Sequence, residues 1–289
     1  MLPEELRQLV GDPLAYNKSL GVLGRYSMAT VSPTAVGLHR LVQAVIRAPL
    51  GPEEERTWAE AAVGLLRAGF PEDSQDVSSF PVSQRLTPHV LAAAEHAERL
   101  GVAGAEVGWL LSWVSGYLRS RGQPRQARPI AERALAVTKA ALEPDDTEVG
   151  ERHDELGRVL IELGEHAATK VEFERALAID EAALGPDHPD VATDGGNLGR
   201  VLQDLGDLAG AKTQLERALA IDEAAYPDHP NVAADRSNLG RVLQDLGDLD
   251  GAKTQLERAL EIGQATLGPD HPNSLASRGF LASGYSEAF

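Results

Sequence analysis

The segment LGRVLQDLGDL occupies residues 198–208 and returns, identical at every position, at residues 239–249. A looser copy, LGRVLIELGE, begins 42 residues upstream of the first at Leu156. The segments that follow these copies recur at the same spacing: FERAL at 173–177, LERAL at 215–219 and LERAL at 256–260. A fixed period of about 42 residues indicates an array of stacked structural repeats rather than one globular core.

The apolar spacing predicts two helices in each repeat. The first helix has apolar residues at i, i+3, i+4 and i+7, namely Leu198, Val201, Leu202 and Leu205. Gly206 is expected to end this helix, because glycine tolerates the left-handed backbone there. A second helix is expected over residues 208–225. A Pro-Asp-His-Pro loop then separates successive repeats, at 186–189, 227–230 and 269–272. Its second proline suits the first turn of a helix.

This repeat resembles the tetratricopeptide repeat. The residues that carry the resemblance are Leu198, Gly199, Leu202, Gly206, Ala211, Leu215 and Ala218, with leucine at both usual aromatic positions. The period of about 42 residues and the Pro-Asp-His-Pro loop are similar to the kinesin-light-chain type. The resemblance covers residues 104–289. It implies an all-α fold: a right-handed α-solenoid of about four and a half helix pairs that binds a protein or peptide in its concave groove.

Two segments before the array resemble parts of bacterial signalling NTPases of the STAND or NB-ARC class. VGLHRLVQAV at 36–45 is similar to the end of their winged-helix domain, and TPHVLAAAEHA at 87–97 to the linker that follows it. The resemblance implies a partial winged-helix remnant at 1–50, a helical linker at 51–103 and the array at 104–289. In that class, a histidine at the position of His39 contacts the nucleotide phosphate.

A nucleotide role for His39 would require a longer parent chain that carries the NTPase domain. The sequence contains no G-x4-G-K-[ST] loop to hold phosphates, so we expect no bound cofactor. A histidine that packs or faces solvent at a helix start is the expected role here.

The non-apolar residues of the first helices define the candidate binding site. Stacked repeats would align three arginines and flank them with amides, and the resulting set is Arg158, Asn197, Arg200, Gln203, Asn238, Arg241 and Gln244. Arginine offers a forked donor for carboxylates, and asparagine can bond both groups of a peptide backbone. In the family, asparagines before the Leu-Gly pair often hold the bound peptide. The alternative is a solvated face on which Arg200 pairs with Asp204, and Arg241 with Asp245.

Composition limits the remaining function classes. Residues 141–289 contain 30 acidic and 12 basic residues, which disfavours nucleic acid and anionic membranes as partners. There is no cysteine, no long apolar run and no basic leader, so we expect a cytoplasmic protein. Neither a Gly-x-Ser-x-Gly elbow nor a His-Glu-x-x-His motif occurs, so no enzymatic activity is expected. The Asp-His pairs of the loops are spread along the array, which argues for helix starts rather than a metal site.

The combined prediction is a protein-interaction module, the ligand-sensing or scaffold region of a bacterial signal-transduction or defence NTPase. The alternative is a structural array that self-associates through its open C-terminal end, where Phe280, Tyr285 and Phe289 could either cap the array or stay exposed. Trp109, Trp113 and Tyr117 share one helix face, and we expect them to pack in the core.

Overall fold

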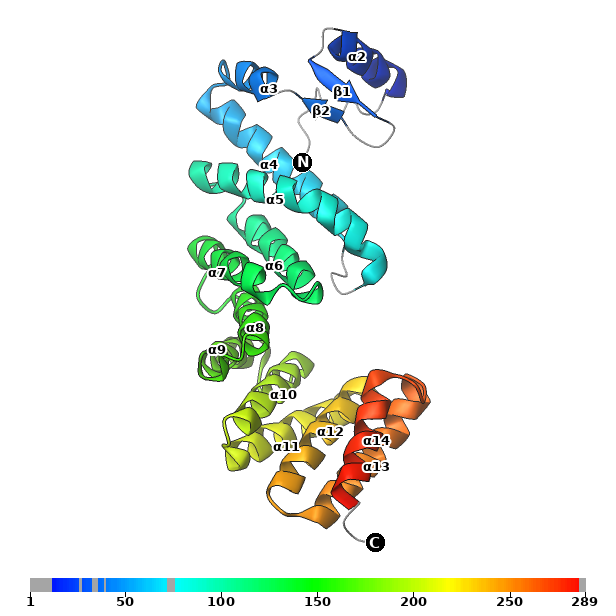
Figure 1. Ribbon diagram of the computed structural model, residues 1–289. Coiled ribbons are helices and arrows are strands. Elements are labelled where there is room, and N and C mark those ends of the chain that lie inside the picture. Colours follow the sequence, from blue (N-terminus) through cyan, green and yellow to red (C-terminus); the bar gives the residue numbers. More distant parts are fainter. Residues whose placement is uncertain (1–11, 26–27, 33–35, 39, 72–75, 286–289) are drawn as a thin grey trace. The chain divides into compact units, whose positions relative to one another are not determined.

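Helices make up most of the chain in the computed structural model (Figure 1). The structure describes residues 12–25, 28–32, 36–38, 40–71 and 76–285. The chain divides into two compact units, Met1–Tyr117 and Leu118–Phe289. His39 and Phe289 lie outside the described residues, so their predicted roles stay predictions. None of the described helices combines the length and the apolar character needed to cross a membrane.

The first unit begins with a helix and a two-stranded hairpin and continues as helices. Its elements are α2 (Pro13–Arg25), β1 (Ala29–Val31), β2 (Val36–Leu38), α3 (Arg40–Arg47), α4 (Pro52–Gly69), the 3-10 turn η1 (Val77–Ser79) and α5 (Phe80–Leu100). Helix α6 (Gly104–Ser120) spans the boundary between the units. Strands β1 and β2 are antiparallel, with Ala29 opposite Leu38 and Val31 opposite Val36. The hairpin is the only sheet among the described residues.

Aromatic side chains pack within the first unit. The Tyr117 ring is buried and meets the Phe80 ring edge-on, with centroids 5.6 Å apart. The guanidinium carbon of Arg67 lies 4.8 Å from the Trp109 ring centroid, and the Trp109 and Trp113 rings are 5.3 Å apart. The expectation that this helix face packs in the core is confirmed for Tyr117, whereas the two tryptophans are only partly buried.

The second unit is a succession of helix pairs. Its helices are α7 (Pro124–Ala141), α8 (Thr147–Glu162), α9 (His166–Leu184), α10 (Pro189–Asp204), α11 (Leu208–Ala225), α12 (Pro230–Asp245), α13 (Leu249–Thr266) and α14 (Pro272–Tyr285). Each first helix packs on the second helix that follows it, as α8 on α9, α10 on α11 and α12 on α13 (Figure 1). The predicted α-solenoid is therefore confirmed, while the division into three domains stays a prediction.

Glycine in the Leu-Gly pair lets the two helices of a repeat approach closely. A β-carbon added at Gly199 would lie 2.6 Å from Leu215 Cγ, and one at Gly240 would lie 2.6 Å from Leu256 Cγ. Both leucines are fully buried. Gly206 ends α10 at φ 82°, the left-handed backbone that the sequence predicts.

The loop histidines start helices, as expected. The side chain of His188 accepts a hydrogen bond from the Asp190 backbone N–H at the start of α10, over 3.2 Å. His229 does the same for Asn231 at the start of α12, also over 3.2 Å. Each imidazole therefore satisfies one of the backbone donors that a helix N-terminus leaves free.

Candidate functional site

The predicted site residues lie on the three first helices α8, α10 and α12. Two hydrogen bonds link neighbouring first helices: Asn197 Nδ2 donates to Asp154 Oδ1 over 3.0 Å, and Gln203 Nε2 donates to Asp245 Oδ2 over 2.5 Å. Asp154 also forms an ion pair with Arg158, whose Nε lies 2.7 Å from Asp154 Oδ2. The side chains therefore form one connected polar surface across successive repeats, rather than isolated helix faces.

The alternative pairing of arginines with aspartates one turn away is wrong. Over the described chain, neither Arg200 with Asp204 nor Arg241 with Asp245 forms an ion pair. Asp204 instead lies 3.6 Å from His166 Nδ1. The physical reason is that each aspartate contacts a side chain of an adjacent repeat instead: Asp204 lies near His166, and Asp245 accepts a hydrogen bond from Gln203.

Arg200 and Arg241 occupy different environments although the sequence around them is identical. The Arg241 guanidinium carbon lies 5.2 Å from the Phe280 ring centroid, and Gln244 Nε2 donates to the Phe280 carbonyl oxygen over 3.2 Å. Arg200 is partly buried, and its buried Nε has no hydrogen-bond partner. Burial lowers the pKa of the Arg200 guanidinium, and the neighbouring Arg158 and Arg241 lower it further, while Asp204 opposes them. Arg200 is thus a desolvated donor without an internal acceptor.

Two equivalent clefts open between successive first helices. The α8–α10 cleft has a volume of about 260 Å³ and is lined by Glu151, Asp154, Asp180, Asp190, Thr193 and Asp194 among others. The α10–α12 cleft has a volume of about 200 Å³ and is lined by Asn197, Arg200, Asp222, Asn231, Asp235 and Asn238 among others. Three of the seven predicted site residues, Asn197, Arg200 and Asn238, therefore line one cleft.

A pair of buried carboxyl groups forms the floor of each cleft. Asp180 of α9 and Asp194 of α10 lie in the first cleft, and Asp222 of α11 and Asp235 of α12 in the second. The backbone makes room for them with glycine: a β-carbon at Gly150 would lie 2.8 Å from Asp180 Oδ1, and one at Gly196 would lie 2.9 Å from Asp235 Oδ1.

Burial raises the pKa of all four carboxyl groups. Burial raises the pKa of Asp235 to about 8, and the charge of Asp222 adds to the effect. Burial also raises the pKa of Asp194 and Asp180, and the surrounding carboxylates, Asp154 and Asp190 among them, raise it further. Ionising both members of a buried carboxyl pair is unfavourable, because the two like charges repel each other with little water to screen them.

Sequence reasoning missed these carboxyl pairs. The available signal was periodic: Asp180 and Asp222 are 42 residues apart, and Asp194 and Asp235 are 41 apart. Each lies on the apolar side of its helix, where an ionised side chain is unexpected. A recurring acid at a buried position of a repeat was therefore the feature that could have located the clefts.

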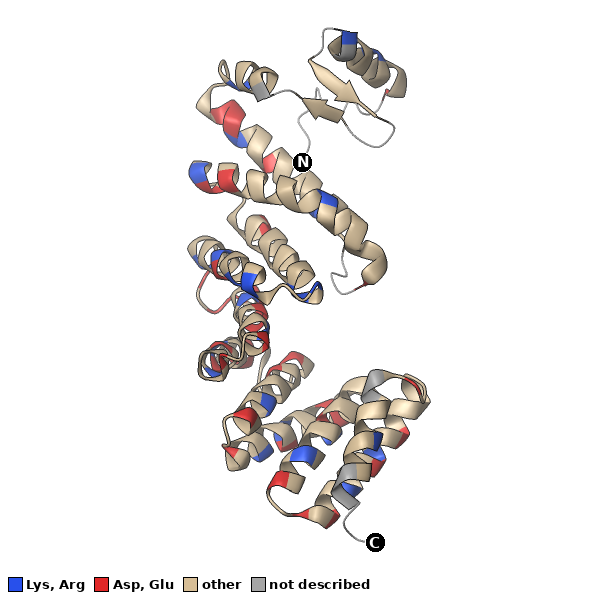
Figure 2. Ribbon diagram, viewed as in Figure 1, with Lys and Arg blue, Asp and Glu red and all other residues tan. Residues whose placement is uncertain are grey.

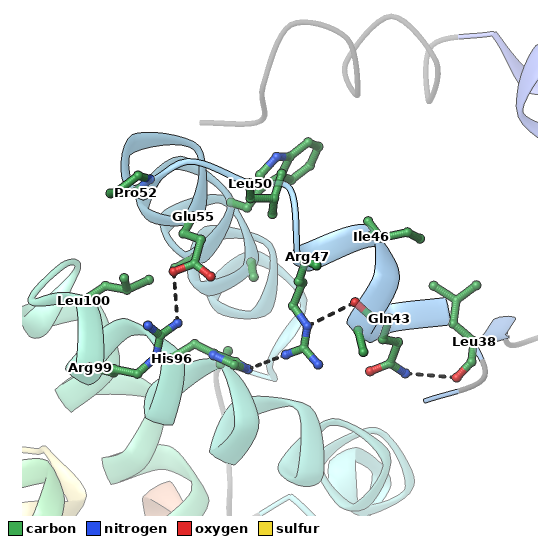
Figure 3. A pocket seen from close by; sticks show the side chains of 16 residues that line it. Leu38, Gln43, Ile46, Arg47, Leu50, Pro52, Glu55, His96, Arg99 and Leu100 are labelled. Atoms are coloured by element: carbon green, nitrogen blue, oxygen red, sulfur yellow. Dashed lines mark hydrogen bonds and ion pairs between the residues drawn. The ribbon is translucent and has the colours of Figure 1, made fainter. Parts of the chain in front are cut away.

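A larger cavity of about 920 Å³ lies in the first unit, between α3, α4 and α5 (Figure 3). Its wall is mostly apolar, and its polar side chains bond one another. Arg47 Nη1 lies 3.1 Å from His96 Nε2, and Arg99 Nη2 lies 3.3 Å from Glu55 Oε2. These contacts connect α3, which contains the second half of the 36–45 segment, with α5, which contains the 87–97 segment. The two segments of the predicted winged-helix and linker regions are therefore close together.

Charge on the second unit is mixed along its helices, with acidic side chains in excess (Figure 2). Many charges pair locally, such as Lys212 with Glu216 at 3.7 Å and Arg258 with Glu261 at 2.6 Å on the second helices. These exposed pairs contribute little to stability. Among the described residues, no three histidine, aspartate or glutamate side chains are placed to hold a metal ion.

Comparison with protein families identifies the class. A tetratricopeptide-repeat model matches residues 153–224, 193–265 and 230–288, and a second such model matches residues 114–148. The chain is therefore a tetratricopeptide-repeat protein, as the repeat pattern predicts. A search of curated protein sequences found no match.

Solved structures agree with the family. Nearly identical TPR-like repeats of kinesin-light-chain type from Podosopora anserina share 25% identity, cover 64% of this chain and 88% of that one, and superpose with a TM-score of 0.56. BtubC from P. vanneervenii shares 20% identity over 78% of this chain and 95% of that one, with a TM-score of 0.59. A STAND protein with a tetratricopeptide-repeat sensor from Pyrococcus horikoshii shares 14% identity, with a TM-score of 0.60; 86% of this chain aligns with 36% of that protein.

Proposed function

We propose that this chain is a non-catalytic recognition module that binds an extended peptide, or the surface of a partner protein, along α8, α10 and α12. The observation that carries the proposal is the partly buried Arg200, whose Nε has no partner inside the protein. Asn197 and Asn238 line the same cleft as Arg200. A peptide carbonyl or carboxylate could accept from the guanidinium, while the amides bond the peptide backbone.

The wider role we propose is that of a ligand sensor in a bacterial signalling or defence NTPase. Two features support it: the sequence segments 36–45 and 87–97, and the fold similarity to a STAND protein whose sensor consists of tetratricopeptide repeats. In such a parent protein, ligand capture by the repeats would change the restraint on an NTPase domain outside this chain. A direct test is to co-express the chain with a candidate NTPase and to measure whether the two copurify.

Self-association through α14 is the second candidate, favoured by the exposed Leu275 side chain on that helix. An exposed apolar end of a repeat array is prone to association. Light scattering across a concentration series tests it, because a mass that stays that of one chain at every concentration would exclude it.

The groove proposal is tested with displayed peptides selected on the full chain. Dissociation constants of the selected peptides are then measured for the wild type and for Arg200→Glu with Arg241→Glu. We expect at least a tenfold loss of affinity, because two donors become acceptors. Lys212→Glu with Lys253→Glu is the matched control, since it reverses two charges on the second helices of the same repeats. Equal affinity of every peptide for the wild type and for the Arg200 and Arg241 variant would overturn the proposal.

A further inference from the structure

We propose that the α8–α10 and α10–α12 clefts are cation subsites of the groove, each of which takes the ammonium or guanidinium group of a lysine or arginine side chain from the bound partner. This inference rests on the groove function proposed above and adds the chemistry of the ligand. It predicts that the partner is basic where it crosses the two clefts.

Both clefts contain buried carboxyl oxygens that accept no hydrogen bond, although Asp180 and Asp194 are also hydrogen-bonded to each other through a shared proton. Asp194, Asp235 and Asp180 are 5%, 7% and 8% exposed, and each has a buried carboxyl oxygen with no hydrogen-bond partner. Leaving one such buried oxygen unpaired costs about 1–3 kcal/mol. The same arrangement recurs in both clefts, and all three side chains line the open space. A donor supplied from outside would satisfy them.

The first cleft has an excess of negatively charged side chains. Glu151, Asp154 and Asp190 line it together with the floor pair Asp180 and Asp194. Arg158 pairs with Asp154 at 2.7 Å and Arg152 pairs with Glu151 at 3.2 Å, so that, among the described residues, Asp190 and the floor pair have no arginine or lysine partner. A positive group that enters this space would meet the exposed Asp190 carboxylate at the rim and the buried pair Asp180 and Asp194 at the floor, where the lower dielectric strengthens the attraction.

The preceding repeat has a buried cation of its own at the equivalent position. In the aligned sequences the position of Asp194 is occupied by Arg152, which is 4% exposed. Its guanidinium lies 3.2 Å from Glu151 Oε2 and 3.5 Å from Glu148 Oε2. The stack thus already holds a guanidinium among carboxylates at the equivalent place. At the last boundary Gly263 and Ser277 replace the floor pair, so only two of these boundaries carry a subsite.

The size of the clefts favours an organic cation over a bare ion. Volumes of about 260 and 200 Å³ are several times the roughly 30 Å³ that one water molecule occupies in the liquid. The described carboxylates and imidazoles also do not form a metal-binding group of three. A side-chain terminus with its hydration fits this space better.

Cation binding would compete with protons. Without a cation and below about pH 8, each floor pair retains a proton because burial and like-charged neighbours raise the pKa: Asp154 and Asp190 at the first cleft, and Asp222 beside Asp235 at the second. Arg200 is the cation that lines the second cleft. Burial raises the pKa of Asp222 there, and the charge of His229 opposes this shift. A bound ammonium group would favour the ionised pair, so its affinity should rise between pH 6 and pH 8.

The experiment uses the full chain with ¹³C-labelled aspartate and three small probes: the Nα-acetyl methylamides of lysine, arginine and norleucine. We expect the lysine and arginine probes to shift the carboxyl resonances of Asp194 and Asp235 saturably, and to bind at least threefold more tightly at pH 8 than at pH 6. The norleucine probe has no charge and should cause no shift. Equal shifts with the norleucine probe, or the same shifts with calcium chloride alone, would overturn the inference.

The decisive variant is Asp194→Asn with Asp235→Asn, which removes one charge from each floor and preserves side-chain shape. We expect at least a tenfold loss of affinity for the lysine probe and for selected peptides. The matched control is Asp187→Asn with Asp228→Asn, the same charge change in exposed loops, which should bind as the wild type does. Circular dichroism confirms that both variants fold.

The outcomes separate this inference from the groove proposal. If peptides lose affinity for the Arg200 and Arg241 variant but bind the Asp194 and Asp235 variant as tightly as the wild type, the groove proposal is supported and the subsite inference is overturned. If probe binding is lost in the Asp194 and Asp235 variant while peptide affinity is unchanged in the Arg200 and Arg241 variant, the subsite inference is supported and the groove proposal is overturned.

Discussion

The guanidinium carbon of Arg241 lies 5.2 Å from the ring centroid of Phe280. One repeat earlier, the residue aligned with Phe280 is Asn238, which lines a cleft together with Arg200. The ring of Phe280 on α14 therefore contacts Arg241, whereas the aligned Asn238 on α12 offers Arg200 no aromatic ring. This contrast explains how identical sequences around two arginines produce one engaged and one unengaged side chain.

A double-mutant cycle should measure the contact between Arg241 and Phe280. Phe280→Leu keeps an apolar side chain but removes the ring, and Arg241→Met removes the charge. We expect a coupling free energy of about 0.5–1 kcal/mol in urea unfolding, the usual range for a cation over an aromatic ring. Strict additivity of the two single variants would show that the contact contributes nothing.

Substitution at the Leu-Gly pair should destabilise the array. Gly199→Ala places a methyl group 2.6 Å from Leu215 Cγ, which is too close for van der Waals contact. The free energy of unfolding should therefore fall by about 1–3 kcal/mol. Gly195→Ala in the same helix meets nothing closer than 3.7 Å and should raise stability by about 0.5–1 kcal/mol through helix propensity. Urea midpoints of the two variants test this. If both variants were equally stable, the close approach would not matter.

Asp235 should make the array less stable as pH rises. Its pKa is raised to about 8 in the folded chain by burial, above the ordinary value of 3.8, so the folded state binds the extra proton between these values. Stability is therefore lost progressively from about pH 4 through pH 8. Asp235→Asn should be more stable than the wild type by roughly 1–3 kcal/mol at pH 9 and by little at pH 4. Asp228→Asn, an exposed control, should show no such difference between the two pH values.

The two cleft asparagines should separate stability from binding. Asn197→Ala removes the hydrogen bond to Asp154 and should lower the free energy of unfolding by about 0.5–1.5 kcal/mol. Asn238→Ala is expected to change stability by less than about 0.5 kcal/mol. Both should weaken groove peptides at least threefold. Unchanged peptide affinity in Asn238→Ala would show that this amide does not contact the ligand.

The repeat pattern predicted the helices of the array because local signals act within each module. Leu198 and Val201 define the buried face, Gly206 the helix end and Pro189 the next helix start. The pairing of Gln203 with Asp245 was not predictable in this way, because it depends on how two repeats stack. Contacts one turn apart within a helix are all that the sequence of one module suggests, and the alternative pairing of Arg200 and Arg241 with their own aspartates was wrong for this reason.

Residues 189–229 form a complete module of 41 residues that starts and ends at equivalent points of two loops. A second copy inserted directly after His229 would bring Asp222 of the first copy against Asp194 of the second. The chain could therefore lengthen by gene duplication without a new kind of junction, and each added unit would create one more acidic compartment. The number of acidic compartments would then change by one with each module that is gained or lost.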